Sequence, residues 1–155
     1  MSSTTLAGNA TELNTAAAVI AYVSKIEQET AEFYETWARK HDECSEIFQS
    51  FVKDNRKNEK NIKRAYYSVV SDALETNFCF EGLRVDMARP QVAQDASSSD
   101  VLKTSLELEK SIRAFYEEAS AVSKALLADV TRVMDRVAKS RKVREEKIRS
   151  MLEKG

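Results

Sequence analysis

The motif Glu-x5-Phe-Tyr-Glu occurs twice in the chain, from Glu27 to Glu35 and again, 82 residues later, from Glu109 to Glu117. Glu27 and Glu109 each interrupt a stripe of apolar residues spaced three and four positions apart, which is the spacing of one face of a helix. Buried carboxylates in proteins coordinate metal ions or pair with cations. The spacing therefore indicates that these two glutamates are the residues around which a site would be built.

The elements that must position these residues are helices. Only three glycines and one proline interrupt 155 residues, of which 43% are hydrophobic, and this favours an all-α fold. Apolar periodicity predicts helices over residues 12–40, 45–76, 100–122 and 126–154. The polar run 41–44 is a short connection, so the first two helices are expected to be antiparallel neighbours. Asp100, which follows three serines, is expected to cap the third helix.

The two copies of the motif indicate two helical hairpins by duplication. Residues 1–11 are expected to be a flexible N-terminal segment, and residues 12–154 a single domain. If a two-fold axis perpendicular to the helices relates the hairpins, the second and third helices are parallel, and a crossover over residues 77–99 must travel the length of the bundle. Its apolar stretch Phe78 to Leu83 is expected to pack along the bundle, with a dimerisation patch or a small-ligand pocket as alternatives.

The repeated motif and the long crossover resemble the ferritin-like superfamily, and the Glu-x5-Phe-Tyr spacing resembles its rubrerythrin branch. The resemblance covers residues 12–154. It implies a four-helix bundle around a di-iron centre, in which two helices give one Glu each and the other two give a Glu-x-x-His pair each. Glu27 and Glu109 match the single glutamates of that ligand set.

The Glu-x-x-His pairs that the resemblance implies are missing from this chain. Asn55 and Asn58 stand at one pair of aligned positions, and Arg141 and Arg144 at the other. The single histidine, His41, has an alanine three residues before it. A guanidinium group is permanently charged and has no lone pair for a metal ion, so no cofactor is expected.

Without a metal, the two glutamates need another source of positive charge, and the two arginines match them in number. We therefore expect a buried polar network of Glu27, Glu109, Arg141 and Arg144, with the two asparagines attached to it. The alternative is that the arginine side chains extend along the bundle surface and end in solvent.

The residues leave two classes of function open. The first is a rubrerythrin-like protein without a metal centre that acts as a binding or interaction module, expected to be a homodimer. The second is a di-iron oxidoreductase or peroxidase with an altered ligand set, in which Glu27 and Glu109 bind iron together with Glu59 or Glu145. DNA binding by basic stretches is a weaker option. A net charge of −1 and interleaved acidic residues argue against a nucleic-acid partner.

The sequence predicts a cytoplasmic protein that does not enter a membrane. The first 24 residues contain no Lys or Arg, unlike the charged start of a signal peptide, and the apolar run 16–21 is too short to cross a bilayer. Cys44 and Cys79 are isolated in the sequence and are expected to be unpaired thiols, as in a reducing compartment.

Overall fold

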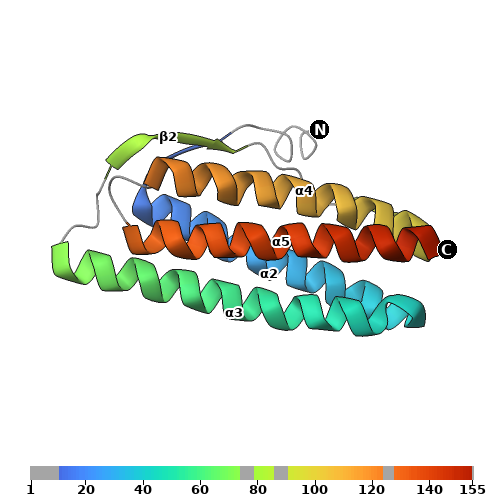
Figure 1. Cartoon of the computed structure of the whole chain (residues 1–155). Helices are drawn as coiled ribbons and strands as arrows, with labels where there is room; N and C mark the ends of the chain where they lie inside the picture. Colours follow the sequence, from blue (N-terminus) through green and yellow to red (C-terminus); the bar gives the residue numbers. More distant parts are fainter. Residues whose placement is uncertain (1–10, 74–78, 86–90, 124–127, 155) are drawn as a thin grey trace.

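A computed structural model describes residues 11–73, 79–85, 91–123 and 128–154 of the chain. Four long helices lie side by side and contain most of these residues (Figure 1). The prediction of a predominantly helical fold with four helices is therefore confirmed. The helices are α2 (Ala16–Lys40), α3 (Asp42–Ala73), α4 (Ser98–Ser123) and α5 (Ala128–Lys154).

The helices form two antiparallel pairs, and each pair consists of two helices that follow each other in the sequence. α2 packs mainly against α3, and α4 mainly against α5, while α3 also contacts α5 and α2 contacts α4. In Figure 1, α3 and α4 run in the same direction. The chain between Ala73 and Ser98 therefore leads from one end of the group of helices back to the other.

Two short strands that are absent from the predicted all-α fold lie beside the helices. β1 (Thr11–Thr15) pairs in antiparallel fashion with β2 (Cys79–Val85), and Leu13 faces Leu83 across the pair. The first helix was expected to begin at residue 12, but it begins at Ala16. Threonine and asparagine are weak helix formers, and threonine is well suited to a strand, so a partner strand from the distant connection takes residues 11–15 out of the helix. Residues 1–10, most of the predicted flexible segment, lie outside the described residues.

Two predicted helix starts were wrong by a few residues. The connection between α2 and α3 is His41 alone, not residues 41–44, because the carboxylates of Asp42 and Glu43 suit the positive end of the α3 dipole. The cap of α4 is Ser97, whose Oγ accepts a hydrogen bond from the backbone N–H of Asp100 at 3.1 Å. Asp100 instead lies in the first turn of α4. The predicted end of the second helix at residue 76 and the predicted start of the fourth helix at residue 126 fall outside the described residues.

Apolar side chains fill the interior in two clusters, one toward each end of the bundle. On every helix a stretch with buried polar residues separates the two clusters in sequence. The first cluster includes Val23, Ile62, Ile112 and Met134, and the second includes Phe48, Phe51, Val101 and Ile148. The helices thus bring their polar interruptions to one common level in the middle of the core.

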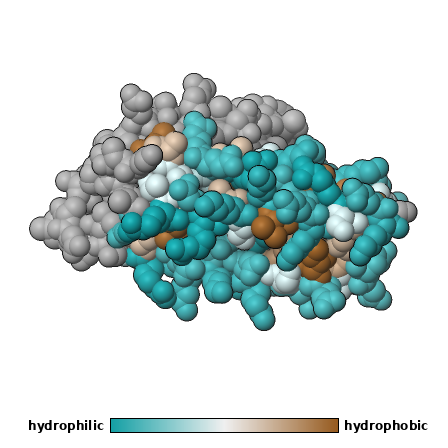
Figure 2. All heavy atoms as spheres, in the orientation of Figure 1, coloured by the Kyte–Doolittle hydropathy of each residue, from teal (hydrophilic) through white to brown (hydrophobic). Residues whose placement is uncertain are grey.

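The surface seen in the orientation of Figure 1 is mainly hydrophilic, with small hydrophobic areas between charged side chains (Figure 2). Among the described residues, the exposed large hydrophobic side chains are Tyr67 on α3, 59% exposed, and Val143 on α5, 47% exposed. Within the same ranges, no helix combines the length and the apolar character needed to cross a membrane.

Candidate functional site: a buried ionic layer

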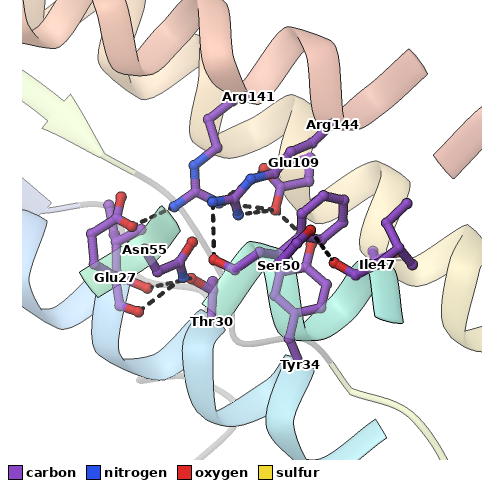
Figure 3. A network of polar contacts seen from close by, with 12 residues as sticks. Glu27, Thr30, Tyr34, Ile47, Ser50, Asn55, Glu109, Arg141 and Arg144 are labelled. Atoms are coloured by element: carbon purple, nitrogen blue, oxygen red, sulfur yellow. Dashed lines mark hydrogen bonds and ion pairs between the residues drawn. The ribbon is translucent and has the colours of Figure 1, made fainter. Parts of the chain in front are cut away.

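Arg141 joins the two glutamates of the repeated motif. Its Nη1 donates to both carboxylate oxygens of Glu109 at 2.9 Å, and its Nη2 donates to Oε1 of Glu27 at 2.7 Å. All three side chains are buried, with at most 1% of their surface exposed. One guanidinium group on α5 therefore links α4 to α2 through two ion pairs in the core (Figure 3).

Arg144 lies one turn further along α5 and completes the charge balance. Its Nη1 donates to Oε2 of Glu109 at 3.3 Å, and its Nη2 donates to the backbone carbonyl of Phe51 on α3 at 3.2 Å. Its guanidinium carbon lies 4.7 Å from the centroid of the Phe51 ring, within range of a cation–π interaction. Only 2% of the side chain is exposed, so the alternative in which the arginines end in solvent does not hold. We call Glu27, Glu109, Arg141 and Arg144 the ionic layer.

Two tyrosines hold the carboxylates of the ionic layer from opposite helices. The hydroxyl of Tyr34 on α2 donates to Oε2 of Glu109 on α4 at 2.5 Å, and the hydroxyl of Tyr116 on α4 donates to Oε2 of Glu27 on α2. Each motif thus supplies the carboxylate for the other motif's tyrosine. Neither tyrosine is among the residues predicted for the site from the sequence. The signal was in the motif, since a tyrosine seven residues after a glutamate lies two turns away on the same helical face.

The two asparagines differ in how they relate to the ionic layer. Asn55 is buried, and its Nδ2 donates to the backbone carbonyl of Glu27 at 3.0 Å and to Oγ1 of Thr30 at 2.6 Å. It therefore attaches to the backbone of α2 rather than to a charged group. The Nδ2 of Asn58 is buried and has no hydrogen-bond partner among the described residues. Asn55 is thus attached to the ionic layer through the backbone of Glu27, while the expected attachment of Asn58 stays a prediction.

Burial and charge act in opposite directions on the groups of the ionic layer. Burial alone would raise the pKa of Glu109, but the positive charges of Arg141 and Arg144 and the hydrogen bond from Tyr34 outweigh it and lower that pKa. Burial disfavours the charged form of Arg141, yet Glu109 and Glu27 hold its pKa well above the ordinary value. The formal charges of the ionic layer, two negative and two positive, sum to zero.

Burial and the nearby carboxylates also keep the two tyrosines protonated. Desolvation raises the pKa of Tyr34 well above its ordinary value, and the negative charge of Glu109 raises it further. Desolvation and Glu27 have the same effect on the pKa of Tyr116. Both hydroxyls consequently remain hydrogen-bond donors across the pH range in which the carboxylates are ionised.

The residues proposed as metal ligands do not fit a di-iron centre. Glu27 and Glu109 are already paired with a guanidinium group that lies against both of them. Glu59 pairs with Lys63 at 3.0 Å, and Glu145 pairs with Arg113 at 2.5 Å. An iron ion beside Glu27 and Glu109 would meet a permanent positive charge where the centre needs anionic ligands.

The remaining candidate ligands that the structure describes do not form another metal site. In the ranges that the structure describes, three or more His, Cys, Asp or Glu side chains do not come together as a possible metal site. His41 lies at the end of α2, where its Nε2 is 2.9 Å from the carbonyl oxygen of Ala96 and its ring stacks on Trp37. Cys44 is buried, and desolvation raises its thiol pKa to about 11.

Comparison of the chain with protein-family models, with curated proteins and with solved structures finds no match.

Replacement of Arg141 by alanine is expected to destabilise the protein by about 3–5 kcal/mol, because it leaves the buried charges of Glu27 and Glu109 without their shared partner. Chemical denaturation measures the change in the free energy of unfolding. Arg136→Ala, an exposed arginine on the same helix, is the matched control and should change stability by less than about 0.5 kcal/mol. Equal stabilities of the two variants would contradict the buried ion pairs.

Because Tyr34 and Tyr116 each donate a hydrogen bond to the glutamate of the other motif, we expect similar losses of stability when either hydroxyl is removed. Tyr34→Phe and Tyr116→Phe each remove a hydrogen bond to a buried carboxylate, so each should lower the free energy of unfolding by about 1.5–3 kcal/mol. Tyr67→Phe, at an exposed position, is the control and should have little effect. A large loss in one variant and none in the other would contradict the equivalent roles of the two hydroxyls.

The lowered pKa of Glu109 predicts that its contribution to stability is lost in acid. The folded state binds a proton at Glu109 less readily than the unfolded state does, so the contribution is present above the unfolded pKa of about 4.3 and disappears as the pH falls through the folded pKa. Unfolding measured between neutral pH and about pH 3 should therefore show a smaller pH dependence for Glu109→Gln than for the unmodified protein. Glu118→Gln, an exposed glutamate of α4, should retain the original dependence. Identical profiles for Glu109→Gln and the unmodified chain would contradict the assignment.

Proposed function

We propose that this chain is a ferritin-like four-helix bundle of the rubrerythrin type in which the ionic layer takes the place of the di-iron centre. In this proposal the protein is a non-catalytic binding or interaction module in the cytoplasm, and it functions as a homodimer. The observation that carries the proposal is the position of Arg141, whose guanidinium group pairs with Glu27 and Glu109 together. A positively charged side chain thus neutralises the carboxylates that would otherwise bind metal.

The helix arrangement supports the ferritin-like assignment. α2 and α3 form one antiparallel pair and α4 and α5 another, and the long connection from Ala73 to Ser98 joins two helices that run in the same direction. The exchanged contacts of Tyr34 and Tyr116 are those expected if a two-fold axis relates the two hairpins. An internal duplication around a central polar layer is the arrangement that the resemblance implies.

The contacts of the other acidic side chains favour the non-catalytic function over the oxidoreductase alternative. That alternative requires Glu59 or Glu145 to join Glu27 and Glu109 as iron ligands. Glu59 is held by Lys63 and by Gln28, whose Nε2 donates to it at 2.9 Å. Glu145 is buried in its pair with Arg113 on α4. Both carboxylates would have to leave these partners to reach a metal ion.

Metal content and peroxide reduction test the proposal directly. Protein produced in iron-rich medium should contain iron only at the background level and should not accelerate peroxide reduction, because Arg141 and Arg144 exclude cations from the carboxylates. Elemental analysis and a coupled peroxidase assay measure the two quantities. About two irons per chain with peroxide turnover would support the oxidoreductase and overturn the proposal.

A variant that carries the ligand set of the resemblance provides the positive control. It combines Asn55→Glu, Asn58→His, Arg141→Glu and Arg144→His, which replace both guanidinium groups and create two Glu-x-x-His pairs. Cobalt(II) is a suitable probe because its visible absorption reports coordination by the protein. The variant is expected to develop this absorption, while the unmodified chain remains colourless.

Sedimentation equilibrium of the unmodified chain tests the proposed homodimer. A single monomeric species would contradict the homodimer part of the proposal.

A further inference from the structure

Exposed basic side chains form a row along α3. Their spacing of four, three and four residues places them on one face of the helix, and they are Lys53, Lys57, Lys60 and Arg64. Tyr67, three residues after the last of them, is also exposed and continues the row. Other basic side chains of α3 have ion-pair partners, since Arg56 pairs with Glu35 and Lys63 with Glu59. Within the part of the chain that the structure describes, the four cations of the row have no such partner.

A second row of the same kind lies on α5. Its exposed cations are Arg132, Arg136, Lys139 and Lys147. Val143 lies midway between the last two, and steps of three or four residues again place the row on one helical face. Arg132 pairs with Asp129 one turn earlier. Tyr67 and Val143 are the exposed large hydrophobic side chains among the described residues, so each row carries one of them.

Contacts between α3 and α5 place the two rows alongside each other. The two helices pack together and run in opposite directions (Figure 1). The hydrogen bond from Arg144 to the backbone carbonyl of Phe51 fixes their relative level. Residues that follow Phe51 on α3 therefore lie beside residues that precede Arg144 on α5, and the stretches 53–64 and 132–139 are neighbours. Axes of packed helices are about 8–10 Å apart. We call the two rows, with Tyr67 and Val143, the basic face.

The positive charge of the basic face is a local feature. The whole chain has 24 basic and 25 acidic residues, so the other surfaces carry the balancing negative charge. The two apolar side chains lie far apart on the face. Val143 is near the level of Phe51, and Tyr67 lies roughly 24 Å further along α3 at 1.5 Å per residue. A partner that contacts both must therefore be elongated.

We propose that the basic face binds an acidic segment of a partner protein. Carboxylates of the segment lie against the two rows of cations, and its apolar side chains lie against Tyr67 and Val143. A helix of about 16 residues spans the distance between these two side chains. The proposal rests on the proposed function as an interaction module, and it adds the surface and the chemistry of the partner.

The charges of the face favour a protein segment over the other possible partners. A second copy bound through the same face in a two-fold dimer would bring cations against cations. A nucleic acid presents phosphates at regular intervals, and these would also meet the exposed carboxylates of Asp54 and Glu146, which follow Lys53 and precede Lys147. A protein segment can place its carboxylates opposite the cations and neutral side chains opposite Asp54 and Glu146.

Fluorescence anisotropy of a labelled acidic peptide tests the basic face. The probe is an amphipathic helical peptide of about 20 residues, with leucines on one stripe and glutamates on both sides of it. The double variant Lys57→Glu/Lys139→Glu, which reverses one charge in each row, should weaken its binding about tenfold or more. Lys25→Glu/Lys103→Glu, with exposed lysines of α2 and α4, changes the net charge equally and should weaken binding less than about threefold.

Measurements on the unmodified protein do not depend on the folding of any variant. Peptide binding should weaken as the salt concentration rises, because the contacts are between exposed charges. No binding of the peptide, or equal losses in the two double variants, would overturn the proposal. Tighter binding of a DNA duplex of about 20 base pairs would assign the face to nucleic acid and would also overturn it.

Sedimentation equilibrium separates the second copy from the acidic partner. Lys57→Glu/Lys139→Glu should leave the association state of the protein unchanged, and a change would place a second copy on the basic face and overturn the proposal. Iron at the background level together with no peptide binding would overturn the docking surface alone. Iron with peroxide turnover would instead overturn the proposed function.

Discussion

The rest of the structure depends on the need to neutralise two carboxylates in the dry middle of a helical core. An isolated ion in such a place is unfavourable by far more than the net stability of a domain, so Glu27 and Glu109 require positive charge close by. Arg141 supplies it by contacting both carboxylates at 2.7–2.9 Å. Because these three residues come from α2, α4 and α5, satisfying the charges also fixes the relative positions of three helices.

The duplicated motif explains the symmetric part of the ionic layer, and α5 supplies the asymmetric part. Tyr34 and Tyr116 hold the carboxylates in equivalent ways from opposite hairpins. Both cations come from α5, whereas the equivalent level of α3 offers the neutral side chain of Asn55. A di-metal centre would draw ligands from both helices. Here Arg141 and Arg144, both on α5, balance the charge of the two carboxylates without any charged side chain from α3.

A neutral set of buried ion pairs differs from a metal centre in what it can contribute to function. It has no open coordination position and no redox chemistry, and its arginine charges cannot be removed by deprotonation. Its main effect is to favour one relative position of the helices, because a shift of one helix would separate paired charges in the core. This agrees with the proposed role as a module that presents a defined surface to a partner.

The sequence alone determined four helices and the position along each helix at which polar residues interrupt its apolar face. Both follow from local periodicity. The sequence also singled out Glu27, Glu109, Arg141 and Arg144, since charged residues on a core stripe are conspicuous without any knowledge of their partners. Only the tertiary structure decided which groups pair, as in the contact of Tyr34 with Glu109 across 75 positions and that of Arg141 with Glu27 across 114. The same holds for the pairing of β1 with β2 and for the attachment of Asn55 to the α2 backbone. These outcomes depend on distances between segments that are remote in sequence, and local spacing carries no information about them.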